Sequence, residues 1–142
     1  MSIREVLFRG KRKDNGEWIE GGYCYCDNKS YIVINTRYIP DTRDWDEADY
    51  YEENPVYKPV FIEVISETVG QYTGLTDKND TKIFEGNIVR GTDAIHRGRE
   101  VYGYIDHKNG SFVIVGDLMT HYRWLDYNVE IIGNIHDNPE LI

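Results

Sequence analysis

Cysteine is scarce in this chain of 142 residues, which has only Cys24 and Cys26. A disulfide between two cysteines with one residue between them is strained, and a disulfide framework needs further pairs. A structural zinc site takes four ligands, and no second Cys or His pair stands at ligand spacing. We therefore expect no disulfide, no metal site and no cofactor, and we interpret both cysteines as small buried or half-buried thiols.

Long hydrophobic runs are also missing. The longest are fragments such as Phe112-Val113-Ile114-Val115, whereas a membrane helix needs ~20 apolar residues. The basic residues between Arg4 and Lys13 are not followed by an apolar stretch of signal-peptide length. We expect no membrane partner and a cytoplasmic protein.

Positive charge is in deficit, with 16 Lys and Arg against 25 Asp and Glu and a net charge of −9. An acidic surface repels phosphate groups, so we do not expect nucleic acid as a partner. The basic cluster Arg9–Lys13 is a local exception. A solvated strand edge is the favoured interpretation of that cluster, with a DNA or RNA contact as the alternative.

Helical periodicity is nearly absent, whereas turn signals are frequent. Asn15-Gly16 and Lys108-Asn109-Gly110 indicate hairpin turns, Gly21-Gly22 indicates a bulge or bend, and Asp27–Ser30 indicates a further turn. The predicted strands are Glu5–Lys11, Glu17–Cys26, Tyr31–Asn35, Val60–Ile65, Val69–Thr73, Lys82–Phe84, Ile88–Arg90, Arg99–His107, Ser111–Val115 and Val129–Ile135.

This pattern predicts an all-β, or mainly β, fold with two small β subdomains. The first covers residues 1–66 and includes an acidic loop at 37–59. The second covers residues 67–142, and we expect it to be a small barrel of the Src-homology-3 (SH3-like) type. Its turn Glu85-Gly86-Asn87 leads into the apolar pair Ile88-Val89, as barrels of that type often begin.

The segment Arg37–Pro59 lacks a strand pattern and holds three of the four prolines. Within it, Asp41–Glu53 carries seven carboxylates in thirteen residues. A segment this charged can bury too little apolar surface to offset an ordering entropy of ~1–2 kcal/mol per residue. We therefore expect a loop that is mobile or ordered by a neighbour. A short helix within 44–53 is an alternative. Asp44, Asp46 and Asp49 resemble a calcium loop only loosely, because the required Gly and closing Glu are missing.

No catalytic constellation is visible, so the sequence predicts no catalytic, cofactor-binding or metal-binding residue. The histidines His96, His107, His121 and His136 lie far apart, and solvated surface is the favoured interpretation for them. Asp77 and Glu85 form a possible carboxylate pair, but turns recruit such residues in any case. The glycines at 21–22 and 70–74 lack the helix and lysine of a phosphate-binding loop.

Two segments carry a resemblance to a known family. Residues 70–90, GQYTGLTDKNDTKIFEGNIVR, and residues 129–142, VEIIGNIHDNPELI, resemble the signature of the YopX family of phage and prophage proteins. The chain has Asp80, Phe84 and Asn87 where the family usually has Gly, Tyr and Asp, which weakens any idea of carboxylate chemistry at position 87. The resemblance covers nearly the whole chain and implies a protein of bacterial host cytoplasm with no established activity.

Three functions remain open. The leading one is a non-enzymatic protein-binding or assembly module, for which a flat, tyrosine-rich apolar face would speak. An acidic inhibitor of a host nucleic-acid-binding or defence protein would show a clustered negative surface. An enzyme would show a pocket with converging polar groups. We also expect self-association through the N-terminal half, around Tyr23, Tyr25 and Tyr31, strengthened by salt because each copy carries −9.

Overall fold

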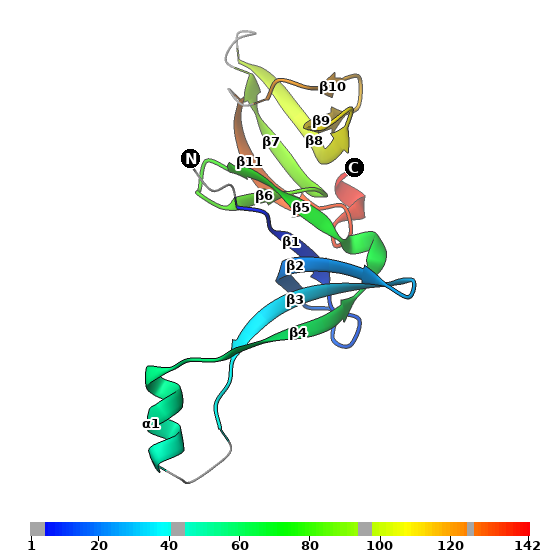
Figure 1. Ribbon diagram of the computed structural model, residues 1–142. Coiled ribbons are helices and arrows are strands. Elements are labelled where there is room, and N and C mark those ends of the chain that lie inside the picture. Colours follow the sequence, from blue (N-terminus) through cyan, green and yellow to red (C-terminus); the bar gives the residue numbers. More distant parts are fainter. Residues whose placement is uncertain (1–4, 41–44, 94–97, 125–126) are drawn as a thin grey trace.

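The computed structural model describes residues 5–40, 45–93, 98–124 and 127–142, and it is built mostly of strands in two antiparallel sheets (Figure 1). The predicted mainly β fold with two small β parts is therefore confirmed. The described residues also contain the helix α1 (Trp45–Glu53) and the 3-10 turns Ser66–Thr68 and Pro139–Leu141. Among these residues no helix has the length and apolarity to cross a membrane.

The first sheet has the strand order β4-β3-β2-β1-β5-β6. Its strands are β1 (Phe8–Lys11), β2 (Trp18–Cys26), β3 (Lys29–Arg37), β4 (Tyr57–Val64), β5 (Gly70–Thr76) and β6 (Lys82–Phe84). The long strand β2 pairs with β1 up to Gly21 and with β3 from Gly22. A side chain at Gly21 would overlap the carbonyl oxygen of Val33, so the predicted bend at Gly21-Gly22 is the point where β2 changes partners.

The second sheet has the order β10-β9-β8-β7-β11 and is open at its two edge strands. Its strands are β7 (Asn87–Asp93), β8 (Arg99–Lys108), β9 (Ser111–Gly116), β10 (Thr120–His121) and β11 (Tyr127–Asn134). The main core lies against this sheet and is formed by Ile83, Val89, Val101, Ile105, Ile114, Trp124 and Val129. Because β5 pairs with both β1 and β6, and Ile83 of β6 joins this core, β5 and β6 connect the two sheets. The boundary at residue 66 stays a prediction.

The tight turns follow the sequence signals. Asp27 and Asn28 have φ values of 52° and 61°, and Asn109 and Gly110 have 52° and 81°. Two successive positive φ values are what primed hairpin turns require, because they match the twist of the paired strands. The predicted hairpin at Lys108–Gly110 is therefore confirmed, and the turn at 27–28 leads directly into β3.

Strands β3 and β4 form a long ribbon that projects from the body and carries α1 at its tip (Figure 1). We call β3, α1 and β4 the arm. The ladder runs from Ser30↔Val64 to Arg37↔Tyr57. The prediction of a structureless 37–59 segment is therefore wrong, and the alternative of a short helix holds for Trp45–Glu53. Asp41 and Asp44, and with them the loose calcium pattern, lie outside the described residues.

Two contacts explain why the helix forms despite its carboxylates. The carbonyl groups of a helix's last turn have no partner within the helix. The guanidinium group of Arg37 donates hydrogen bonds to the carbonyl oxygens of Tyr51 and Glu52, at 3.3 and 3.2 Å. The ring of Tyr51 also packs edge-on against Tyr38, with 5.0 Å between centroids. Contacts from Arg37, at the end of β3, and from Tyr38 thus hold a segment whose own composition gives a weak helical signal.

Candidate functional site

Asp77 belongs to the candidate acidic pair, and its carboxylate is hydrogen-bonded to backbone N–H groups. Its Oδ1 accepts hydrogen bonds from the N–H groups of Asn79 and Thr81 at 2.8 and 3.0 Å, and its Oδ2 accepts one from Ile131 at 3.0 Å. Burial raises the pKa of Asp77, but these three donors outweigh burial and hold it below its ordinary value. Asp77 thereby joins the β5–β6 turn to β11, so one signature segment is fastened to the other.

The turn Glu85-Gly86-Asn87 is also structural. Asn87 is buried, and its Oδ1 accepts a hydrogen bond from the N–H of Phe84 at 2.7 Å. Glu85 accepts one from the N–H of Gln71 at 2.9 Å. Gly86 has a φ of 88°, which only glycine adopts readily. Asp80 has a φ of 62°, a left-handed conformation that Asp tolerates.

The C-terminal signature segment connects the two sheets through Asp137. Its carboxylate accepts hydrogen bonds from Lys11 Nζ at 2.6 Å, Trp18 Nε1 at 2.7 Å and Asn134 Nδ2 at 3.1 Å. The ammonium group of Lys11, followed by the two neutral donors, holds the pKa of Asp137 far below its usual range. Lys11 and Trp18 belong to the first sheet, so this carboxylate fastens the tail to it.

The basic cluster lies at the same junction. The guanidinium group of Arg9 lies 4.5 Å from the ring centre of Trp18 and 4.8 Å from that of Phe84. Such stacking between aromatic faces is a packing role that arginine fills well. This arrangement differs from the predicted solvated edge at Arg9, whereas Lys13 is 65% exposed and fits that prediction.

A polar cluster that sequence reasoning missed lies at the far end of the second sheet. Asp93 is fully buried, and its Oδ2 lies 3.6 Å from Arg99 Nη2. The Tyr127 hydroxyl lies 3.4 Å from His121 Nδ1. The interpretation of His121 as solvated surface is wrong, because its side chain is buried under this network.

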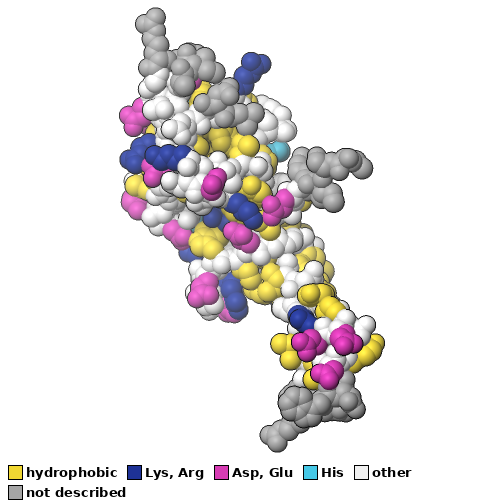
Figure 2. Space-filling model, turned by 90° about the vertical axis from the view of Figure 1, so that its left-hand side faces the viewer, with side chains coloured by type: hydrophobic (Ala, Val, Ile, Leu, Met, Phe, Trp, Pro, Cys, Tyr) yellow, Lys and Arg dark blue, Asp and Glu magenta, His cyan; other side chains and the backbone are white. Residues whose placement is uncertain are grey.

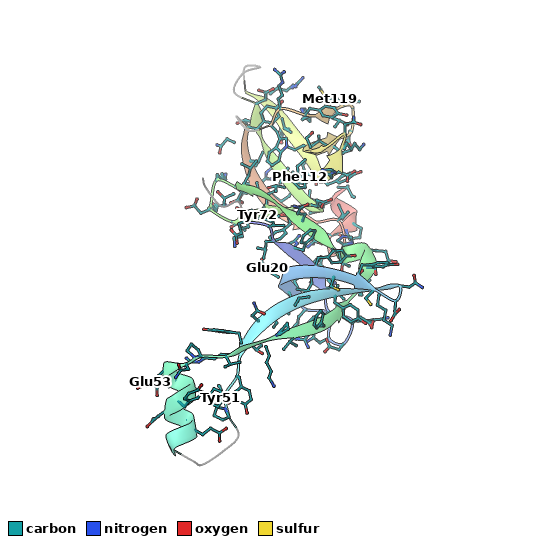
Figure 3. All side chains as sticks on the ribbon, viewed as in Figure 1. Glu20, Tyr51, Glu53, Tyr72, Phe112 and Met119 are labelled. Atoms are coloured by element: carbon teal, nitrogen blue, oxygen red, sulfur yellow. The ribbon has the colours of Figure 1, made fainter. Side chains whose placement is uncertain are left out.

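Burial and the neighbouring Arg99 lower the pKa of His121, although Asp93 opposes them. Burial and Asp93 raise the pKa of Tyr127. Both groups are therefore neutral near pH 7. An open pocket of about 240 Å³ lies beside the cluster, with Arg99 and His121 in its wall and Leu118 and Met119 at its rim. Figure 3 labels Met119 at this end of the sheet.

The other candidates do not assemble into a site. His107 is exposed and packs against Phe112, His136 packs against Trp18, and His96 lies outside the described residues. Both cysteines are free thiols; Cys24 is half-buried as predicted, whereas Cys26 is exposed, so its interpretation as a buried or half-buried thiol is wrong. Within the described part of the chain, no group of three or more His, Cys, Asp or Glu side chains could hold a metal ion.

The arm presents an apolar face. Cross-strand pairs place Tyr31 opposite Glu63, Val33 opposite Phe61 and Arg37 opposite Tyr57 on one side of the ribbon. We define the arm face as Tyr31, Val33, Tyr57, Pro59 and Phe61. Tyr57 and Phe61 are 59% and 55% exposed, and Phe61 packs edge-on against Tyr31. The opposite side carries Ile32 and Val64, both buried. Hydrophobic side chains are visible along the arm and beside the acidic helix at its tip (Figure 2).

The edge of β4 is less suited to pairing with another strand than the arm face is to side-chain contacts. In an antiparallel strand both polar groups of a residue point to the same side. The Glu63 carbonyl accepts a hydrogen bond from the Lys13 N–H, on the side of β4 that faces away from β3. Because backbone groups alternate in direction along a strand, the backbone groups of Phe61, Pro59 and Tyr57 also point away from β3. Proline has no N–H to offer, and it commonly blunts exposed edges. Contacts through the arm therefore depend on side chains rather than on strand addition.

Taken together, the chain is a mainly β protein of two connected antiparallel sheets with a projecting arm, and its signature residues hold that fold together. The sequence model of the family described as YopX protein matches residues 7–142. The chain therefore belongs to the YopX family, as its two signature segments predicted.

A solved structure shares the fold. It is the crystal structure of protein EF1440 from Enterococcus faecalis, with a TM-score of 0.57, 22% sequence identity, and coverage of 98% of this chain and 99% of that one. At this identity the likeness concerns the fold alone. No curated protein matches the chain.

Proposed function

We propose that this protein is a non-enzymatic protein-binding or assembly module that makes its contacts through the arm face. From its family we also propose that it is encoded by a phage or prophage and acts in the cytoplasm of the bacterial host. Its net charge of −9 favours protein rather than nucleic acid as the partner.

The observation that carries the proposal is the exposure of large apolar side chains on a ribbon that its own chain leaves uncovered. Tyr57 and Phe61 are more than half exposed on the arm face. Val56, next to Tyr57, and Tyr50 of α1 are also exposed, at 42% and 59%. A rimmed apolar patch of this kind typically marks an interaction site. Tyrosine and phenylalanine are also the residues enriched at protein interfaces.

The test compares two lysine substitutions at exposed apolar positions. Tagged wild-type protein, Phe61→Lys and Leu118→Lys are incubated with host lysate, and the captured proteins are identified and then purified for calorimetric titration. Leu118 is 98% exposed and lies on the second sheet's pocket rim, so it controls for added charge and lost apolar surface. We expect Phe61→Lys to weaken a purified partner's binding by roughly thirtyfold, as for a central interface residue, with Leu118→Lys unchanged. Equal binding by all three would overturn the proposal.

The polar cluster supports a second candidate, an enzyme with a site assembled across strands. Asp93, Arg99, His121 and Tyr127 come from four separate strands, and two of them meet the pocket wall. A neutral imidazole hydrogen-bonded to a tyrosine is a possible general base. Turnover of ester or phosphoester substrates that is lost in His121→Gln, with unchanged unfolding, would favour this candidate over the first.

The tip helix supports a third candidate, an acidic inhibitor of a host nucleic-acid-binding or defence protein. Asp49, Glu52 and Glu53 are exposed on α1, and its last turn contains no basic residue. Such a partner would bind through a basic surface, so its affinity would fall steeply with salt. Capture that depends on Glu52 and Glu53 but not on Phe61 would identify this case.

A further inference from the structure

The arm face has opposite charges at its two ends. At the base, Lys13 and Lys29 share the single carboxylate of Glu63, at 3.0 and 3.8 Å, and both lysines remain more than half exposed. At the tip, α1 contributes Glu47, Asp49, Glu52 and Glu53, which Arg37 and Lys58 offset only in part. The apolar residues of the arm face lie between a positive base and a negative tip.

We propose that the partner of the arm face is a second copy of this chain, packed face to face with its arm running in the opposite direction. This inference rests on the proposed function and names the partner for the same surface. A twofold axis through the middle of β4, at Val60, places Phe61 of each copy over Pro59 of the other. It also places Tyr57 near the other copy's Glu63 and Tyr31, and brings each acidic tip toward the other copy's basic base.

The geometry of the ribbon suits this arrangement. From Glu63 to Tyr57 the strand covers six residue-to-residue steps, or ~20 Å at the usual rise, so the charged ends lie far enough apart to act as separate contacts. An isologous pairing uses each contact twice, because residue i meets residue j and residue j meets residue i. Pro59 blocks edge-to-edge ladder growth, so a closed pair is favoured over an open stack of strands.

The charges at the two ends of the arm face also provide a way to distinguish this antiparallel pair from other partners of the same face. The net charge of −9 repels a second copy at long range, and salt screens that repulsion. Salt weakens the tip-to-base attraction as well, so the salt dependence contains two terms of opposite sign. Reversal of the charges at one end is therefore the decisive perturbation.

The experiment measures molar mass by light scattering during size exclusion, at high protein concentration and in low and moderate salt. Four chains are compared: wild type, Lys13→Glu/Lys29→Glu, Glu52→Lys/Glu53→Lys, and Phe61→Lys. Leu118→Lys again serves as the matched control, and thermal unfolding verifies that each variant folds.

We expect wild type and the control to reach twice the chain mass of 16.7 kDa. Each charge-reversed variant alone should dimerise at least tenfold more weakly, because its ends repel. An equimolar mixture of the two charge-reversed variants should recover the double mass, because both tip-to-base contacts then pair opposite charges. Phe61→Lys should stay monomeric.

A single-chain mass for wild type in both salt conditions overturns the inference. So does an unchanged dimer in Phe61→Lys, or a mixture of the charge-reversed variants that stays monomeric. These results leave the proposed function standing if Phe61→Lys still loses capture of a different protein. If no arm substitution affects the dimer, and Phe61→Lys captures host proteins as well as wild type does, both the inference and the proposed function are overturned.

Discussion

The body and the arm use the same residue types for different purposes. In the body, Phe84 is 2% exposed and Asp77 is 6% exposed, and both are enclosed by the chain's own strands. In the arm, Phe61 is 55% exposed and Glu52 and Glu53 face solvent. The difference indicates that the family signature serves folding, because its polar groups are bonded to the backbone, whereas the exposed apolar side chains of the proposed contact surface lie in a region without the signature.

The largest expected difference concerns the two phenylalanines. Phe84→Ala should lower the free energy of unfolding by about 3–5 kcal/mol, since truncating a buried aromatic side chain leaves a cavity. Phe61→Ala should change it by less than about 1 kcal/mol, because more than half of the residue is already exposed and its ring packs edge-on at the surface against Tyr31. Urea unfolding followed by circular dichroism measures both, and equal losses would break the distinction between body and arm.

The next effect concerns Asp77. Asp77→Asn should lower the free energy of unfolding by about 2 kcal/mol near pH 7, because an amide cannot accept on both sides and leaves the Ile131 N–H without an acceptor. The folded pKa of Asp77 is depressed, so its contribution is complete above the unfolded pKa of about 3.9 and is lost as pH falls through the folded value.

The variant should therefore have a flatter stability profile below about pH 4 than the wild type. Asp80→Asn, on the same turn with its side chain exposed, is the control. A stability difference between Asp77→Asn and wild type that stays constant from pH 7 to pH 3 would contradict the assigned role.

A smaller effect separates two glycines. Gly110 has a φ of 81° and open space around it, whereas Gly22 has an ordinary φ and only van der Waals contact with Val33. Gly110→Ala should cost about 1 kcal/mol of unfolding free energy through backbone strain alone. Gly22→Ala, at the arm face, should lie within about 0.5 kcal/mol of wild type. Thermal unfolding of the two variants compares them, and a larger loss for Gly22→Ala would reverse the assignment.

Local signals explain which parts of the fold were predictable. Asn109-Gly110 and the turn at Asp27-Asn28 are short segments whose conformations depend on their own residues, so the hairpins could be recognised. The signature segments were recognisable for the same reason, because each of their turns needs a particular residue such as Gly86.

The parts that could not be predicted depend on long-range contacts. The α1 helix is held by Arg37 and Tyr38, which come before a weakly helical, strongly acidic stretch. The polar cluster joins Asp93, His121 and Tyr127 from separate strands. One signal was present: Val89, Gly91 and Asp93 alternate on the buried face of β7, which places a carboxylate at an inward position.

The most direct test of the central claim removes the tip of the arm. Because the Tyr38 N–H already bonds to the Val56 carbonyl oxygen at 2.7 Å, residues 39–55 can be replaced by an Asn-Gly turn between Tyr38 and Val56. Light scattering of this shortened chain should give the mass of a single chain, with cooperative unfolding within about 1 kcal/mol of wild type. A shortened chain that still has twice its own mass would contradict the tip-to-base contact between copies, and one that no longer unfolds cooperatively would contradict a body that folds without the tip.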